Sequence, residues 1–155
     1  MPFVKVYIHF VWSTKNREPF LDSKELRVKV WNHIRTNAKE KGIFIDYING
    51  YSDHCHCLIS LGVDQTIQMV MQLIKGESSF WINKEQLLAE IASPMKNELP
   101  KFEWQDEYFA VSVSESMLDK VRNYIKNQDQ HHTTKTFQEE YDEFISKYGF
   151  EKFKD

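Results

Sequence analysis

The chain has 155 residues, 20 of them basic and 23 acidic, and its formal net charge is −3. This near-balance excludes a protein that coats nucleic acid through its overall charge, although a local basic face stays open. No apolar run approaches the ~20 residues that span a bilayer, and two cysteines are too few for a disulfide framework. At roughly one domain per 150 residues, we expect a single domain over residues 1–155 in a reducing cytoplasm.

The first predicted element is a strand near the N-terminus. Apolar residues alternate with more polar ones from Val4 to Trp12, and a period of two is typical of a strand with one buried face. The same alternation places Lys5, Tyr7 and His9 together on the more polar face. We interpret that face as a candidate floor for a ligand site.

The next two strands are predicted to form a hairpin. The apolar, β-branched run 43–48 predicts a second strand, and Asn49-Gly50 is typical of a tight hairpin turn. Residues 54–61 predict a third strand, which would then run antiparallel to the second. A fourth strand is predicted at residues 108–113, after a proline-containing loop at residues 93–105.

Apolar residues at helical spacing predict four helices, at about residues 22–42, 67–81, 117–130 and 136–149. Capping signals mark three of their starts: Asp22 with Glu25, Ser114 or Ser116, and Thr136 with Glu139. Gly42 and Gly149 end the first and the last helix.

The resulting β-α-β-β-α-β order predicts an α+β fold of the ferredoxin-like or RRM-like kind. In that arrangement two helices cover one face of an antiparallel sheet, and the other face stays open unless something covers it. The core would span about residues 3–132, with an extra C-terminal helical extension at about 136–149.

Two histidines, His54 and His56, occupy alternate positions of the predicted third strand, so both point to one face. Cys55 and Cys57 then point to the opposite face as small buried hydrophobes. Two imidazoles at this spacing can bind a divalent metal jointly, whereas the plainer interpretation is a pair of surface histidines. A zinc site that uses both residue types is disfavoured, because the strand separates them and no second cluster completes four ligands.

A second motif lies on the predicted helix at about 117–130. Tyr124 and Gln128 are four residues apart and are therefore neighbours on one helix face. A tyrosine at the edge of the core and a surface glutamine are the simplest interpretation of this pair. His131 and His132 follow directly. We interpret them as a polar helix end, with contact to a metal or to DNA as the less favoured alternative.

Together, the element order and the two motifs resemble the single-tyrosine transposases of the HUH superfamily, the enzymes of the smallest bacterial insertion sequences. The similarity covers about residues 4–130. Further matching segments are Tyr7–Lys15 with Arg17 and Pro19, Lys75–Ser79, and Trp104–Phe109. Cys55 departs from the aliphatic residue that is usual in the family, and its side chain is expected to point into the core.

The resemblance implies a metal-dependent DNA transposase that cleaves and rejoins single-stranded DNA at insertion-element ends through a 5′-phosphotyrosine intermediate. In this reading Tyr124 is the catalytic nucleophile, and His54, His56 and Gln128 hold Mg²⁺ or Mn²⁺. The implied partners are single-stranded DNA hairpins at element ends and a second copy of the chain. Family dimers pair through their first strands and can form composite sites, with the histidines of one chain beside the tyrosine of the other. The implied location is the bacterial cytoplasm, at the nucleoid when the protein acts.

Contacts to DNA are predicted by charge alone. The candidates are Lys15, Arg17, Lys75, Lys120 and Lys126. Phosphate contacts of this kind position a nucleic acid without reading its sequence.

Other functions stay open at the level of sequence. One is a non-catalytic or domesticated ferredoxin-like nucleic-acid-binding protein, since such sheets also serve RNA recognition. The chain lacks the aromatic-rich third strand of that module, because His54 and His56 stand in its place. A third reading is a metal-dependent hydrolase with water as nucleophile, which would form no covalent adduct.

Overall fold

The computed structural model describes residues 2–89, 100–132 and 135–148. Its centre is a four-stranded antiparallel sheet in the order β2-β3-β1-β4. The strands are β1 (Val6–Ser13), β2 (Phe44–Tyr51), β3 (His54–Leu61) and β4 (Phe109–Val113). This confirms the predicted α+β class with an antiparallel sheet.

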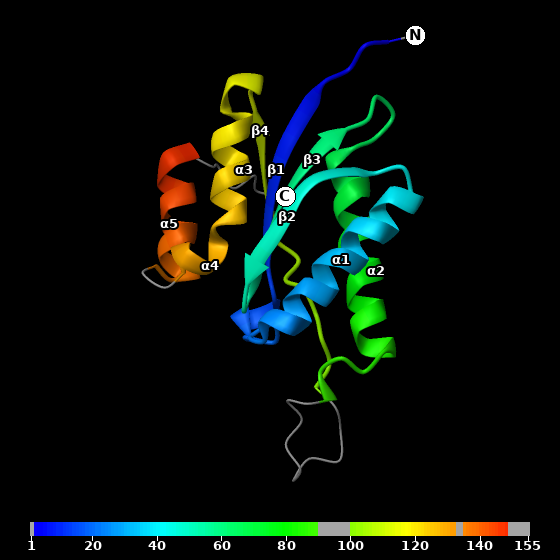
Figure 1. Ribbon diagram of the computed structural model, residues 1–155, viewed down its shortest axis with the longest axis vertical. Coiled ribbons are helices and arrows are strands. Elements are labelled where there is room, and N and C mark those ends of the chain that lie inside the picture. The colour runs from blue at the N-terminus through cyan, green and yellow to red at the C-terminus, as the bar shows by residue number, and fades with distance from the viewer. Residues whose placement is uncertain (1, 90–99, 133–134, 149–155) are drawn as a thin grey trace, which may run out of the picture.

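Helices cover both faces of the sheet (Figure 1). One layer consists of α1 (Lys24–Glu40) and α2 (Ile67–Lys84). The other consists of α3 (Leu118–Lys126), the short α4 (Gln128–His131) and α5 (Phe137–Tyr148). Two 3-10 turns, η1 (Lys15–Arg17) and η3 (Glu115–Met117), lie in the connections. The face that the ferredoxin-like pattern leaves open is therefore occupied by the helices that follow β4.

The main core lies between the sheet and the layer of α1 and α2. Phe10, Trp12, Cys55, Cys57 and Ile59 are at most 1% exposed and pack there, as the alternation along the strands predicts. The first strand begins at Val6 rather than Val4, so Lys5 lies outside it and pairs with Glu115 at 2.5 Å. Tyr7 and His9 do share the face opposite this core.

The start of α1 differs from the prediction, because the helix is capped by Ser23 and not by Asp22. Ser23 has extended backbone angles, and its side chain accepts a hydrogen bond from the Leu26 N–H at 3.3 Å. This is the usual geometry of an N-cap. Gly42 follows the helix end with a φ of +75°, as predicted for a glycine that ends a helix.

The predicted turn at Asn49-Gly50 is wrong, because β2 continues through both residues to Tyr51. Gly50 pairs with Cys55, and a Cβ at this position would lie 2.2 Å from the backbone oxygen of His54. The glycine is therefore needed because the backbone of β3 approaches it closely, and not because the chain turns here. Asn49 donates its side-chain N–H to the Ile125 and Lys126 carbonyls at 3.0 and 3.1 Å, which ties the end of α3 to the sheet.

The third predicted helix is broken at Asn127, so Tyr124 lies on α3 and Gln128 begins α4. Neither Ser114 nor Ser116 caps α3, because the two hydroxyls bond each other at 3.1 Å. By contrast, Thr136 accepts a hydrogen bond from the Glu139 N–H at 3.2 Å, as predicted for the start of α5. The predicted end at Gly149 lies outside the described residues, as does the part of the 93–105 loop before Pro100.

The first strand lies inside the sheet, between β3 and β4. It pairs with β3 from Val6 to Ser13 and with β4 from Tyr7 to Val11. Both edges of β1 are therefore occupied from Tyr7 to Val11, which leaves no free edge over this stretch for pairing with a second copy. Within the described part of the chain, no helix combines the length and apolar character needed to cross a bilayer.

Candidate active site

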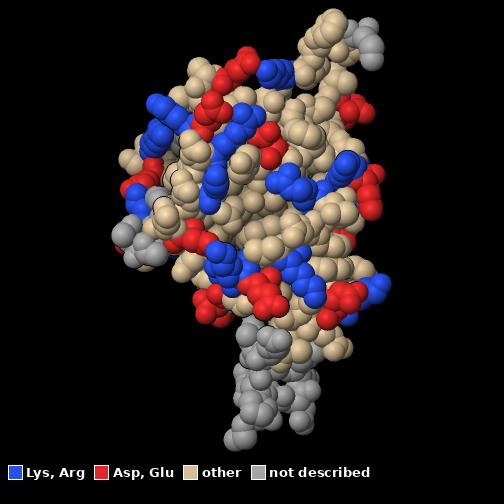
Figure 2. Space-filling model, in the orientation of Figure 1, with Lys and Arg blue, Asp and Glu red and all other residues tan. Residues whose placement is uncertain are grey.

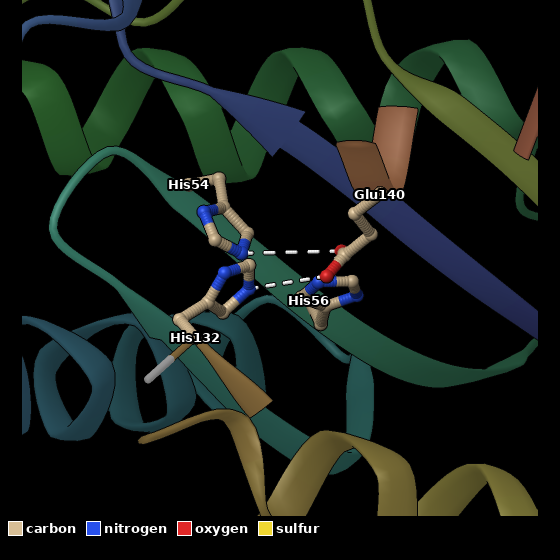
Figure 3. A group of neighbouring side chains, drawn as sticks. All are labelled: His54, His56, His132 and Glu140. Carbon is tan, nitrogen blue, oxygen red and sulfur yellow. Dashed lines mark ion pairs between the residues drawn. The ribbon is translucent and has the colours of Figure 1, made fainter. Parts of the chain in front are cut away.

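The functional candidates gather on the sheet face under α3, α4 and α5. His54 and His56 project from β3 to this side, and both are fully buried. His9 of β1 and Gln128 of α4 lie beside them and are also buried. Figure 3 shows that His132 and Glu140, which follow α3 in the chain, point toward the same two histidines.

Contacts on both sides of the ring orient His54. Its Nδ1 lies 2.8 Å from the Asp53 carboxylate, which accepts the ring proton and leaves a lone pair on Nε2 when the imidazole is neutral. That Nε2 lies 3.2 Å from Gln128 Oε1. The Gln128 amide nitrogen donates to the Tyr124 carbonyl, which turns Oε1 toward the histidine. In that neutral form of His54, two acceptor atoms face each other, an arrangement that a cation between them would stabilise.

His56 lies between a second histidine and a carboxylate. Its Nδ1 is 3.0 Å from His9 Nε2, and its Nε2 is 2.5 Å from Glu140 Oε1. Burial lowers the pKa of His9 to about 3 and that of His56 to about 4. Both imidazoles are therefore neutral near pH 7, which is the form that can ligate a metal.

His132 belongs to the site, although we interpreted it from sequence as part of a polar helix end. Its Nδ1 donates to the Lys135 carbonyl at 2.7 Å, and its Nε2 lies 3.0 Å from Gln128 Oε1 and 3.1 Å from Glu140 Oε2. Burial works to lower the pKa of His132, but the Glu140 carboxylate outweighs it and raises the pKa. The spacing of four residues from Tyr124 to Gln128 to His132 was the signal that could have identified it.

Glu140 is the second residue that the sequence analysis missed. It lies on the buried side of α5, next to Tyr141 and one turn from Phe137 and Phe144. Burial works to raise the pKa of Glu140, but the imidazoles of His132 and His56 outweigh it and hold the pKa well below the usual range. A glutamate within an apolar helical stripe was a weak signal, because such a residue is more often a solvated side chain at the edge of the stripe.

The ligand atoms of this group converge on one point. One atom each from His54, His56, His132 and Glu140 lies within 4.8 Å of the others, so the group could hold a metal ion. Imidazole nitrogens with carboxylate and amide oxygens form a mixed donor set that a divalent cation such as Mn²⁺ accepts. The facing acceptors of His54 and Gln128 fit this interpretation.

Tyr124 approaches the same point from α3. Its ring centroid lies 5.5 Å from that of His56 and 6.3 Å from that of His9, edge to face in both cases. Burial raises the pKa of Tyr124, and the nearby Glu140 carboxylate raises it further. The fold thus brings the histidine pair, Gln128 and Tyr124 together within one chain.

Three of the five basic candidates for DNA binding already have partners inside the protein. Lys15 pairs with Glu103 at 3.2 Å. Lys75 donates to the Gln105 and Asp106 carbonyls at 2.6 and 3.0 Å. The Arg17 guanidinium lies against α5, over the rings of Phe137 and Tyr141.

The other two candidates, Lys120 and Lys126, are exposed on α3. On the side of the molecule drawn in Figure 2, Lys and Arg side chains are interspersed with acidic ones around an uncharged central area. Among the residues that the structure describes, that side therefore shows no continuous basic surface.

The sheet with its paired histidines defines an HUH-like cluster in an α+β fold, and the comparisons agree with this class. The family described as "Transposase IS200 like" matches residues 3–128, and the chain belongs to that family. Comparison with curated proteins gives no match.

Two solved structures share the fold. One is a protein of Deinococcus radiodurans R1, provisionally assigned as a transposase, with 22% identity and a TM-score of 0.61 over 82% of this chain and 93% of that one. The other is a REP-associated tyrosine transposase bound to a REP hairpin, with 15% identity and a TM-score of 0.59 over 85% of this chain and 72% of that one. At these identities the likeness shows the fold alone.

Proposed function

We propose that this protein is a metal-dependent DNA transposase that cleaves and rejoins single-stranded DNA at insertion-element ends through a 5′-phosphotyrosine. The observation that carries the proposal is the convergence of His54, His56, Gln128 and Tyr124 on one buried point of the sheet. Family membership supports the reaction class.

In the proposed reaction, the Tyr124 hydroxyl oxygen attacks the phosphorus of a phosphodiester. A bond forms between tyrosine and phosphorus, the bond from phosphorus to the 3′ oxygen breaks, and the hydroxyl proton ends on the departing 3′ oxygen. The covalent link conserves the phosphodiester, so a 3′ hydroxyl can reverse the step and rejoin DNA. Asp53 and His9 orient the histidines through their second ring nitrogens.

His54, His56 and Gln128 would hold Mg²⁺ or Mn²⁺, with His132 as a neighbouring donor. When bound, such an ion polarises the scissile phosphate and neutralises the charge that develops on it.

The proposed nucleic-acid partner is a single-stranded hairpin at the element end. The related structure that is bound to a REP hairpin supports this class of ligand. The exposed Lys120 and Lys126 lie on the helix that carries Tyr124 and would contact phosphates beside the cleavage point.

We further propose that each site is complete within one chain, because α3 and α4 reach the histidines of their own sheet. Mixing Tyr124→Phe protein with His56→Ala protein should then restore no activity. A homodimer stays a prediction from the family resemblance, and recovery of activity in that mixture would instead indicate composite sites.

The test incubates the protein with single-stranded oligonucleotides tiled across the DNA that flanks its gene, with Mg²⁺ or Mn²⁺, followed by denaturing gels. We expect a covalent protein–DNA adduct that is lost in Tyr124→Phe, in His56→Ala and on metal removal. Tyr47→Phe is the matched control, because Tyr47 packs on the same sheet face at Leu58, beside the histidine pair.

Cleavage that survives Tyr124→Phe would contradict the tyrosine mechanism and favour a hydrolase that uses water. Binding to DNA without adduct in either metal would favour the non-catalytic nucleic-acid-binding alternative.

A further inference from the structure

The candidate site is closed to DNA in this structure. His54, His56 and Gln128 have 0% exposure, and Glu140 has 1%. A phosphodiester must approach the tyrosine and the metal ligands within bonding distance. Because no surface of these ligands is accessible, some covering element has to move before a DNA strand can react.

The covering element is α5, which contacts the site through an aromatic stripe and through Glu140. The Phe137 ring stacks on His54 with centroids 4.3 Å apart. Tyr141 and Phe144 lie against Phe109 of β4, with ring centroids 5.1 and 5.7 Å from it. In Figure 1, α5 forms the outer part of its layer beside α3, so it can leave without dismantling the sheet.

Arg17, which lies in η1 near the N-terminus, contacts α5. Its guanidinium lies 5.2 Å from the Phe137 ring centroid and 5.0 Å from that of Tyr141, and it donates a hydrogen bond to Gln138. Asn16 and Arg17 have φ angles of 56° and 54°, in the left-handed region that costs a side-chain-bearing residue free energy. Such angles persist where the surrounding structure holds the residue, and Arg17 is held here by its contacts with α5.

The α5 helix is negatively charged, as a DNA strand is. The helix contains four acidic residues and one lysine, a net charge of −3. Its Glu140 carboxylate lies 2.5 Å from His56 Nε2 and 3.1 Å from His132 Nε2. A carboxylate and a phosphodiester both offer anionic oxygens, so the two would compete for the same position.

We propose that α5 is an autoinhibitory cover, in which Glu140 takes the place of the scissile phosphate and Arg17 acts as the latch, and that single-stranded DNA displaces it. The inference rests on the proposed function, because it names the regulation of that same site. Displacement leaves the position facing His54, His56 and Gln128 to a phosphate oxygen. It also releases Arg17, one of the predicted DNA contacts, to bind the incoming strand.

The test uses the full chain and two independent readouts. The first is labelling of His56 by diethyl pyrocarbonate without DNA or metal, quantified by peptide mass spectrometry, with His33 on α1 as internal reference. The second is the rate of adduct formation with a hairpin oligonucleotide. The variants are Glu140→Gln and Arg17→Gln, and Arg17→Gln is assessed by labelling alone because it removes a predicted DNA contact. Glu139→Gln is the matched control, since it makes the same charge change at an exposed position of α5.

We expect Glu140→Gln and Arg17→Gln to raise labelling of His56 at least about threefold, because weaker contacts shift the population toward the open state. Glu140→Gln should also raise the adduct rate at least about tenfold, since each lost charged hydrogen bond is worth that factor or more. Glu139→Gln should leave both readouts at the wild-type level. Thermal melts check that every variant folds.

The outcomes separate the two proposals. Unchanged labelling of His56 in both variants overturns the cover, whatever the adduct assay gives. An adduct rate in Glu140→Gln at or below that of Glu139→Gln also overturns it, provided that the wild-type protein forms adduct. Raised labelling with no adduct in any protein supports the cover and contradicts the transposase activity.

Discussion

The two faces of the sheet bury different kinds of side chain, apolar on one face and polar on the other. Phe10 and Cys57 on one face are fully buried under α1 and α2 in an apolar layer. Their strand neighbours His9 and His56 are buried on the other face, in contact with each other and with residues of α3, α4 and α5. Apolar burial stabilises at roughly 25 cal/mol per Å², whereas a buried polar group costs free energy unless it is paired.

This contrast assigns stability and chemistry to opposite sides of the same strands. The apolar face is held together by packing and needs no bound ligand. Its packing can therefore stabilise the sheet while the histidines of the other face exchange one binding partner for another. On the polar face, the groups that stabilise the histidines come from helices that follow β4, including the Glu140 carboxylate. A site assembled in this way can exchange one anionic partner for another without loss of the sheet.

The largest effect on stability is expected from the apolar face. Phe10→Ala should lower the free energy of unfolding by about 3–5 kcal/mol, because it leaves a cavity in a closely packed core. Urea denaturation measures this change. Val28→Ala on the exposed side of α1 is the control and should have little effect. A loss of less than about 1 kcal/mol for Phe10→Ala would show that the sheet does not depend on this layer.

The second prediction concerns the polar face alone. Asp53→Asn should weaken Mn²⁺ binding about 10–100-fold, because the Asp53 carboxylate 2.8 Å from Nδ1 orients His54. Calorimetric titration of the folded protein measures the affinity. Asp64→Asn is the matched control, since Asp64 is exposed beyond the other end of β3. Equal affinities in the two variants would contradict a metal-binding role for His54.

Local periodicity was enough to predict which face each residue of β3 occupies. Alternation along a strand is a property of the backbone, so His54 with His56, and Cys55 with Cys57, could be separated without a structure. The hairpin turn was predicted wrongly because Gly50 signals a turn in sequence, while in the fold its missing side chain lets Trp31 and the His54 carbonyl approach. The sequence contains no local trace of that contact.

The candidate site was predictable only as far as its motifs were local. The pair His54 and His56 and the spacing of Tyr124 and Gln128 were recognised, and the fold brings them together. Glu140 depends on how α5 packs, which is decided by contacts between segments far apart in the chain.

The smallest predicted effect compares basic residues on the two sides of the sheet. Lys126 lies on α3, near Tyr124, and Lys29 lies on α1 on the opposite side; both are exposed. Each substitution by glutamine removes one positive charge, so any effect of net charge is the same in both.

If Lys126 neutralises a phosphate, Lys126→Gln should reduce the slope of log affinity against log salt by about 0.7, the value for one contact on a single strand. Lys29→Gln should leave the slope unchanged. Because the expected difference is smaller than one ion per complex, each slope is determined from affinities at four or more salt concentrations. Equal slopes for Lys126→Gln and Lys29→Gln would place the DNA away from the C-terminal end of α3.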